Sequence, residues 1–268
     1  YANGRGQIYA MSAEGSSWTN LSSNGYCDRS LAWSPDGREI AFVSDRNGDW
    51  EIFVMKADGS NQRRLTNSPG RDSHPAWSPD GRHIAFCRDV GGDVDIYMMN
   101  AKGSGERPVV ERPGNQWDPA WSADGSLMAY ASVRRDGGLV QLFVTNVNSG
   151  KVQLVLRAAG ISCLQWSPTG SRLAGVYEDY SSGSTEPGLT GIFNIDGTSP
   201  ANEILRSRYW IDRIRPGPRD EYKLVSAHSV RPYSADFWSG KPTPNWYSKG
   251  GASPRWVLKS FASVRWSP

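Results

Sequence analysis

The stretch Ala32-Trp33-Ser34-Pro35-Asp36-Gly37-Arg38 decides the fold, because it recurs at a constant interval along the chain. It returns as Ala76-Trp77-Ser78-Pro79-Asp80-Gly81-Arg82, as Ala120-Trp121-Ser122-Ala123-Asp124-Gly125 and as Gln165-Trp166-Ser167-Pro168-Thr169-Gly170. The four tryptophans are separated by 44, 44 and 45 residues. A fixed period of roughly 20–50 residues is typical of solenoids and propellers. We therefore take this repeat as the structural unit.

Each repeat divides into four strand-like pieces. The first ends at the tryptophan and is followed by a Ser-Pro-Asp-Gly turn, in which Pro presets φ and Gly accepts positive φ. The second is an apolar run such as 39–43, the third is 52–55, and a turn at 57–60 leads into the fourth. Four strands in about 44 residues predict a propeller blade. Gly and Pro interrupt every window longer than about ten residues, which argues against helices.

The repeats predict an all-β fold, a six-bladed β-propeller of four-stranded blades that forms one domain, 1–268. A degenerate fifth copy lies around 214–217, and a sixth begins at 265–268. Residues 6–16 match a third strand, so we expect N- and C-terminal strands to share one blade and close the ring, which removes open sheet edges. The expected blades are approximately 26–69, 70–113, 114–158, 159–206 and 207–259, with a closing blade of 260–268 plus 1–25.

Composition excludes some classes of function. The chain of 268 residues carries a net charge of +3 with 21% charged residues, which gives no indication of nucleic-acid binding. No apolar run approaches the roughly 18 residues of a membrane span. Three cysteines without a C-x-x-C pair indicate neither a zinc site nor a disulfide framework, and we expect no metal and no cofactor. The chain starts at Tyr1 without a signal peptide, so we expect a processed chain or an excised fragment.

The repeat also resembles a known family. Pro-Ala-Trp-Ser-Pro-Asp-Gly-Arg-x-Ile-Ala-Phe, then Ser-Asp-Arg-x-Gly, Ile-Tyr/Phe-Val-Met-x-Ala-Asp-Gly-Ser and Arg-Leu-Thr, is similar to the TolB-type propeller repeat, or PD-type WD-like repeat. The resemblance is close over 26–150 and weak beyond 180. It implies a six-bladed propeller in the periplasm, or otherwise outside the cytoplasm, that binds a lipoprotein on one face. The same repeat occurs in propellers of peptidases and sugar lyases, so the fold alone does not determine the function.

The repeated residues are interpreted as framework. One tryptophan per repeat at the same strand position fits packing between blades. Asp36, Asp80 and Asp124 are expected to hydrogen-bond to the backbone of their own turns. The charged residues around Asp45 and Arg46 are expected to form an ion pair within the loop between the second and third strands.

The residues just before each tryptophan differ between repeats, and this variation is what could specify a partner. Propeller topology places the loops before the first strand and after the second strand together, at the mouth of the central channel. Exposed Trp, Tyr and Arg are enriched at interface hot spots. Trp117 and Trp210 are equally compatible with buried packing. The candidate partner-binding residues on this face are Asp28, Arg29, Asp72, His74, Trp117, Asp118, Tyr209 and Trp210, with Arg46 and Arg88 from the neighbouring loops.

These features predict a non-catalytic binding scaffold whose partner is another protein, either an envelope protein or subunits of a larger assembly. A Gly-x-Ser-x-Gly elbow is missing. Of the three histidines, His74 and His228 lie on different repeats without a motif, and His83 is expected at the surface where a turn meets a strand. One alternative is an accessory or substrate-gating propeller of a multidomain peptidase or hydrolase. Another is a polysaccharide lyase or hydrolase that uses Asp72 and Asp118 as paired carboxylates.

Overall fold

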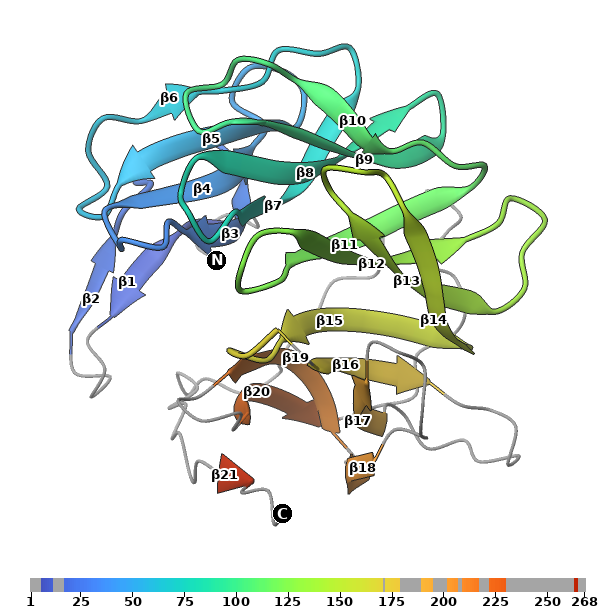
Figure 1. The fold of residues 1–268 in the computed structure, drawn as a ribbon. Helices are drawn as coiled ribbons and strands as arrows, with labels where there is room; N and C mark the ends of the chain where they lie inside the picture. The colour runs from blue at the N-terminus through green and yellow to red at the C-terminus, as the bar shows by residue number, and fades with distance from the viewer. Residues whose placement is uncertain are drawn as a thin grey trace, which may run out of the picture.

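The protein is seen in a computed structural model that describes 6–11, 17–170, 172–178, 189–194, 202–206, 209–216, 222–229 and 263–264. Every regular element in these ranges is a β-strand (Figure 1). Side chains are described for the first two ranges and for 172–175. The all-β class expected from the repeats is confirmed.

Four antiparallel sheets of four strands each follow one another along the chain, and in each sheet the strands lie in chain order. They resemble propeller blades, and we call them blades one to four. Blade one holds β3 (Asp28–Trp33), β4 (Glu39–Ser44), β5 (Glu51–Lys56) and β6 (Arg63–Arg64); blade two holds β7 (Arg71–Trp77), β8 (His83–Val90), β9 (Asp93–Asn100) and β10 (Arg107–Val110). Blade three holds β11 (Asn115–Trp121), β12 (Leu127–Val133), β13 (Val140–Asn146) and β14 (Val152–Ala158); blade four holds β15 (Gly160–Trp166), β16 (Arg172–Glu178), β17 (Leu189–Asn194) and β18 (Asn202–Arg206).

Two smaller sheets lie at the ends of the chain. The first is a hairpin of β1 (Tyr9–Met11) and β2 (Trp18–Asn20), and the second contains β19 (Tyr209–Pro216), β20 (Tyr222–Ser229) and β21 (Ser263–Val264). β21 pairs with β20 rather than with β1. The rest of 260–268 lies outside the described residues. The described strands therefore do not show N- and C-terminal strands paired in one closing blade, as the repeats predict.

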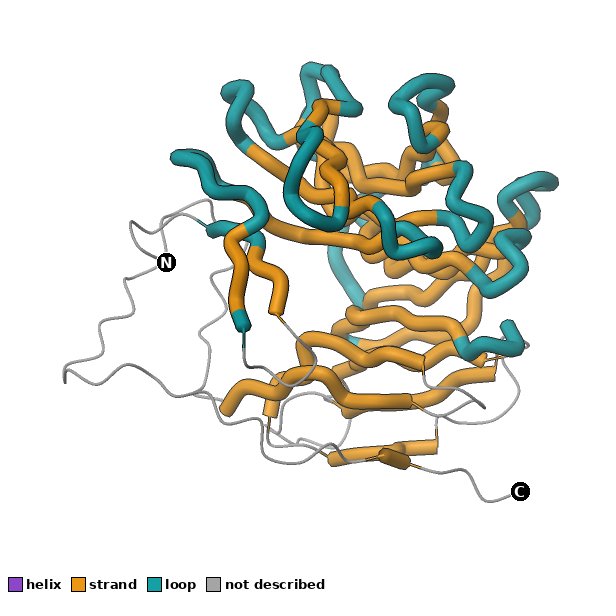
Figure 2. Tube along the Cα trace, turned by 90° about the vertical axis from the view of Figure 1, so that its left-hand side faces the viewer, coloured by secondary structure: helices purple, strands orange, loops and turns teal. Residues whose placement is uncertain are grey.

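The first strands of successive sheets lie beside one another. Contacts link β3 with β7, β7 with β11, β11 with β15 and β15 with β19. The sheets form an arc (Figure 1), and Figure 2 shows their strands layered from the upper to the lower part of the view, with loops at their ends. We call these five strands the inner strands. The side on which they begin is the mouth face, and the side on which they run into the Ser-Pro-Asp-Gly turns is the turn face.

The hydrophobic core lies between the sheets. In blade one, Phe42 and Phe53 pack with Ile8 and Leu21 of the N-terminal segment. On the other side of the same sheet, residues of β4 and β5 pack against Ile84 and other residues of blade two. Further clusters join blade two to blade three and blade three to blade four. Both faces of these sheets are buried, which is why the second strands read as continuous apolar runs.

The framework role of the repeated residues is confirmed. The Asp36 carboxylate accepts hydrogen bonds from Ser34 Oγ at 2.7 Å and from the Arg38 amide at 3.1 Å. Equivalent contacts hold the turns at Asp80 and Asp124, and hydrogen bonds from Ser122 and Ser126 lower the pKa of Asp124 to about 2.

The tryptophans of the repeat join neighbouring blades. Trp121 Nε1 donates to the carbonyl oxygen of Ala76 at 3.1 Å, and Trp166 Nε1 donates to that of Ala120 at 2.9 Å. Each bond runs from one inner strand to the inner strand of the preceding blade. Trp121 and Trp166 therefore act as packing residues between blades, as their spacing predicts, whereas Trp33 of blade one is 41% exposed.

Candidate functional site

Two of the predicted binding residues, Asp72 and Arg88, form a buried ion pair inside blade two. Arg88 Nε and Nη2 donate to the two carboxylate oxygens of Asp72, both at 2.8 Å, and Arg88 Nη1 donates to Glu106 at 2.7 Å. The guanidinium lies over the rings of Phe86 and Tyr97. Burial raises the pKa of Asp72, and the contacts with Arg88 oppose this. The pair connects the inner strand to the outer part of the blade.

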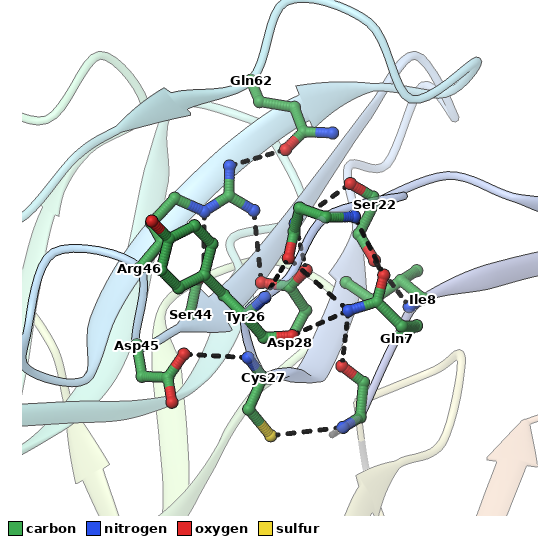
Figure 3. A network of polar contacts seen from close by, with 12 residues as sticks. Gln7, Ile8, Ser22, Tyr26, Cys27, Asp28, Ser44, Asp45, Arg46 and Gln62 are labelled. Atoms are coloured by element: carbon green, nitrogen blue, oxygen red, sulfur yellow. Dashed lines mark hydrogen bonds and ion pairs between the residues drawn. The ribbon is translucent and has the colours of Figure 1, made fainter. Parts of the chain in front are cut away.

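Blade one repeats this arrangement with Asp28 and Arg46. Arg46 Nη2 donates to Asp28 at 3.2 Å, and Arg46 Nη1 donates to Gln62 at 2.6 Å (Figure 3). The guanidinium lies 5.3 Å from the ring centroid of Phe42 and 4.7 Å from that of Phe53. Planar guanidinium groups suit this combination of carboxylate pairing and aromatic stacking. The Asp28 side chain is fully buried.

These contacts show that Asp28, Arg46, Asp72 and Arg88 brace the blades, and a contact with a partner stays a prediction for them. The ion pair expected within the loop is wrong for blades one and two, because the arginine reaches the inner strand instead. It is confirmed in blade three, where Arg134 pairs with Asp136 at 3.0 Å. A buried carboxylate without a partner costs far more free energy than an exposed one, so the arginine pairs with the buried carboxylate of the inner strand.

A β-bulge recurs in the middle of the inner strands of blades one to four. At each bulge the strand register shifts, and one residue that is not glycine takes a left-handed backbone conformation. Such residues are uncommon, and strained backbone of this kind clusters at functional sites. These bulge positions are Ser30, His74, Asp118 and Cys163, with φ of 49°, 51°, 60° and 57°. Each lies three residues before the repeat tryptophan.

Sequence reasoning missed the strain at the bulge positions. All four residues share one offset from the tryptophan but differ in chemistry. None of them is glycine, the residue that usually marks a left-handed backbone, so the sequence carried no signal for this strain.

His74 and Asp118 occupy the bulge positions of two neighbouring blades. His74 is exposed, and its Nδ1 lies 3.1 Å from Ser73 Oγ. Asp118 Oδ2 accepts a hydrogen bond from the Leu164 amide at 3.0 Å, which ties it to the next inner strand. Desolvation by the surrounding protein lowers the pKa of His74, while the charge of Asp118 raises it and that of Arg29 lowers it.

Arg29 is exposed next to the bulge of blade one. Its guanidinium carbon lies 3.7 Å from the ring centroid of Trp50, in cation–π geometry. Partial burial lowers the pKa of Arg29, and the Asp45 carboxylate opposes this. The structure therefore brings Arg29, His74 and Asp118 together from three successive inner strands.

The predicted aromatic residues have other placements. Trp117 is half-buried between blade three and its neighbours, and its Nε1 donates to the carbonyl oxygen of Ile161 at 3.2 Å. This contact assigns Trp117 to packing. Tyr209 and Trp210 begin the inner strand β19, opposite Ser229 and His228, and their side chains lie outside the described ones.

The described residues hold neither a cluster of metal-binding side chains nor a helix that could span a membrane. Their histidine, cysteine and carboxylate side chains form no group of three that could hold a metal ion. The described part of the chain has no helix long and apolar enough to cross a membrane.

Successive four-stranded antiparallel sheets with neighbouring inner strands place the chain among proteins built from propeller-type blades. Residues 62–186 match the family model of PD40, the TolB beta propeller domain. The repeat is of this TolB type. No curated protein sequence matches the chain.

Solved structures support the same fold. The chain is similar to TolB from Acinetobacter baumannii, with a TM-score of 0.68 and 19% identity over 81% of this chain and 53% of that one. A structure from Agrobacterium tumefaciens that carries the TolB name has a TM-score of 0.70 and 19% identity, over 86% and 80% of the two chains. Oligogalacturonate lyase from Vibrio parahaemolyticus has a TM-score of 0.57 and 14% identity, over 76% and 62%. The chain spans about half the length of the A. baumannii TolB.

Proposed function

We propose that this chain is a non-catalytic scaffold that binds another protein through its mouth face. One observation carries the proposal: within a strictly repeated framework, the bulge position holds a different side chain in each of four blades. A residue needed only for folding would be expected to repeat as the tryptophan does. Variation on a rigid support is typical of a recognition surface. The likeness to a lyase concerns the fold alone and does not carry an enzymatic proposal.

The accessible part of the mouth face has the chemistry of an interface. It combines the exposed Arg29 on Trp50 with His74 and Asp118, so cationic, aromatic and acidic groups lie together. The inner strands position these groups on rigid sheets, so little conformational entropy is lost when a partner binds.

Photo-crosslinking from the two faces tests this proposal. A photoreactive amino acid is placed at Asn47, in a mouth-face loop, and in a matched variant at Lys102, in a turn-face loop; both positions are exposed. We expect a discrete protein adduct from Asn47 and none from Lys102 when each variant is exposed to its native cellular extract. Adducts from Lys102 alone would contradict the mouth-face assignment. The same adduct from both positions would show non-specific capture and would count equally against it.

We propose further that the sheets are blades of a six-bladed ring, and that β1 and β2 are the third and fourth strands of its closing blade. One face of this hairpin carries Tyr9, Met11 and Trp18, which are 52%, 48% and 65% exposed. The other face packs on blade one. Trp33 is also exposed, at 41%, whereas Trp166 donates to the preceding inner strand. A neighbouring blade and the inner strands of a closing blade would cover these apolar surfaces.

Amide hydrogen exchange tests the closing blade. The Leu21 amide donates to the Ile8 carbonyl, so alternation along an antiparallel ladder directs the Ala10 amide toward β2 and the Tyr9 and Met11 amides away from it. A closing strand on the outer edge of β1 predicts slow exchange at Tyr9 and Met11, comparable with that at Ala10. Protection at Ala10 with free exchange at Tyr9 and Met11 would contradict closure at this edge.

A further inference from the structure

The guanidinium of Arg29 is held in place, and the charge of the nearby Asp45 carboxylate acts on it without an ion-pair contact. Its flat face lies on Trp50, which leaves the N–H edge open. Among the described residues, Arg29 forms no ion pair. The other arginines on this side of blades one and two do have carboxylate partners: Arg46 with Asp28, Arg71 with Asp49 at 3.8 Å, and Arg88 with Asp72.

His74 supplies a second donor beside Arg29. The two residues come from neighbouring inner strands, and they are close enough for the charge of Arg29 to act on the imidazole. His74 Nδ1 is next to Ser73 Oγ, and Nε2 has no hydrogen-bond partner among the described residues. Asp118 approaches from the next blade, with one carboxylate oxygen already accepting from a backbone amide.

The remaining groups around His74 are neutralised. Asp72, on the same strand, is paired with Arg88, and Arg71 lies near Asp49. Cys87 on β8 is buried, and burial raises the pKa of its thiol, so it stays uncharged. Arg29, His74 and Asp118 are therefore the groups that respond to a ligand here.

We propose that Arg29 and His74 form a subsite for a carboxylate of the partner protein, an aspartate or glutamate side chain or a chain terminus. This inference rests on the proposed function and specifies the chemistry of the bound surface. The open edge of a guanidinium presents paired N–H donors that match a carboxylate. His74 adds a donor from its Nε2 when it is protonated. Occupation of the subsite gives Arg29 the direct carboxylate contact that it does not make with any described residue.

Histidine NMR tests the subsite directly, because the chain has three histidines and their ring signals can be assigned with a His74→Gln variant. Acetate is titrated at constant ionic strength, with chloride as the balancing salt. Acetate is expected to shift the His74 signal saturably and to raise its titration midpoint, since a nearby anion stabilises the imidazolium. The signal of His83, which lies on the turn-face side of blade two, is expected not to move.

Arg29→Gln provides the decisive variant, and Arg38→Gln, in the same blade on the turn face, provides its control. Arg29→Gln should weaken the acetate response at least about tenfold, the usual scale for losing a charge-assisted hydrogen bond. Without acetate it should also raise the His74 midpoint, because a neighbouring positive charge is removed. Arg38→Gln should change neither.

Three outcomes would overturn the subsite: no response of His74 to acetate, an unchanged response in Arg29→Gln, or saturation by inorganic phosphate at lower concentration than by acetate. The last would identify a phosphate site. If one of these occurs while the Asn47 adduct still forms, the subsite fails and the proposed function stands. A normal acetate response without any mouth-face adduct would support the carboxylate subsite and would contradict the proposed binding of a protein through the mouth face.

Discussion

Replacing Gly114 with alanine is expected to lower the free energy of unfolding by about 3–5 kcal/mol, the sum of backbone strain and overpacking. Gly114 precedes the inner strand of blade three with φ of 102°, which L-residues rarely adopt. A Cβ there would lie 2.1 Å from the Val133 carbonyl oxygen and 2.9 Å from Arg134 Cα. Both are backbone atoms at the end of the second strand, so a side-chain rotation cannot relieve the contact.

Gly138 is the matched control for this prediction. Its φ of 104° is nearly the same, but nothing lies within 4 Å of the position a Cβ would take. Gly138→Ala should therefore cost only the backbone strain, about 1–3 kcal/mol. Urea denaturation of both variants measures the difference. If both variants lost the same free energy of unfolding, the close approach of backbone atoms at Gly114 would not constrain the blade.

Replacing Arg88 with methionine is expected to cost about 3–5 kcal/mol, because the Asp72 carboxylate is left buried without its partner. The Asp72 carboxylate is fully buried. The control ion pair, Arg82 with Asp80 at 3.9 Å, lies at the surface, where the Arg82 side chain is 81% exposed. Arg82→Met, the control, should change stability by less than about 0.5 kcal/mol. The free energy of unfolding from urea denaturation compares the two.

A second substitution separates buried charge from lost packing. Adding Asp72→Leu to Arg88→Met removes the unpaired charge, so the double variant should be more stable than Arg88→Met alone. In Arg88→Met, burial raises the pKa of Asp72 without the opposing contacts of Arg88, and only the hydrogen bond from Thr66 still lowers it. The deficit should therefore shrink as pH falls through this raised pKa, because the folded state then binds a proton that the unfolded state does not. A deficit independent of pH would instead indicate lost packing over Phe86 and Tyr97.

Most of the blade architecture could be predicted from the repeat. The spacing from Trp33 to Trp166 located the inner strands, and the Pro-Asp-Gly turns and the packing role of the tryptophans followed from local chemistry. These features depend on residues close together in sequence or repeated at a fixed offset. The fifth sheet and β21 depend on segments where the repeat degenerates, and β21 pairs with β20 instead of with β1.

The bracing pairs were harder to predict because their partners lie 16 and 18 residues apart. A comparison of repeats contained the signal. Asp72 and Arg88 lie directly opposite in the sheet, and in blade three the same pair of positions holds Gln116 and Ser132. In blade three the acidic and the basic residue are thus both replaced by neutral ones, as expected for two residues that neutralise each other.

The candidate site could be predicted only in part. Arg29, His74 and Asp118 were identified by their position before the tryptophan, and the structure brings these three together. The stacking of Arg29 on Trp50 and the left-handed bulge could not be foreseen, because both depend on how neighbouring strands pair and bend. Asp72 is buried inside the blade, and the bulge that follows breaks the alternation of the strand, so that Ser73 is partly accessible and His74 is exposed.

The most direct test of the account is the dissociation constant of the protein captured through Asn47, measured for two double variants. Arg29→Ala with His74→Ala alters the mouth face, and Arg38→Ala with Arg82→Ala removes the same kind of exposed charge from the turn face. We predict at least about tenfold weaker binding for the first variant and less than about twofold for the second. Unchanged binding in the mouth-face variant, or a larger loss in the turn-face variant, would contradict the proposal that this protein binds its partner through the residues of its inner strands.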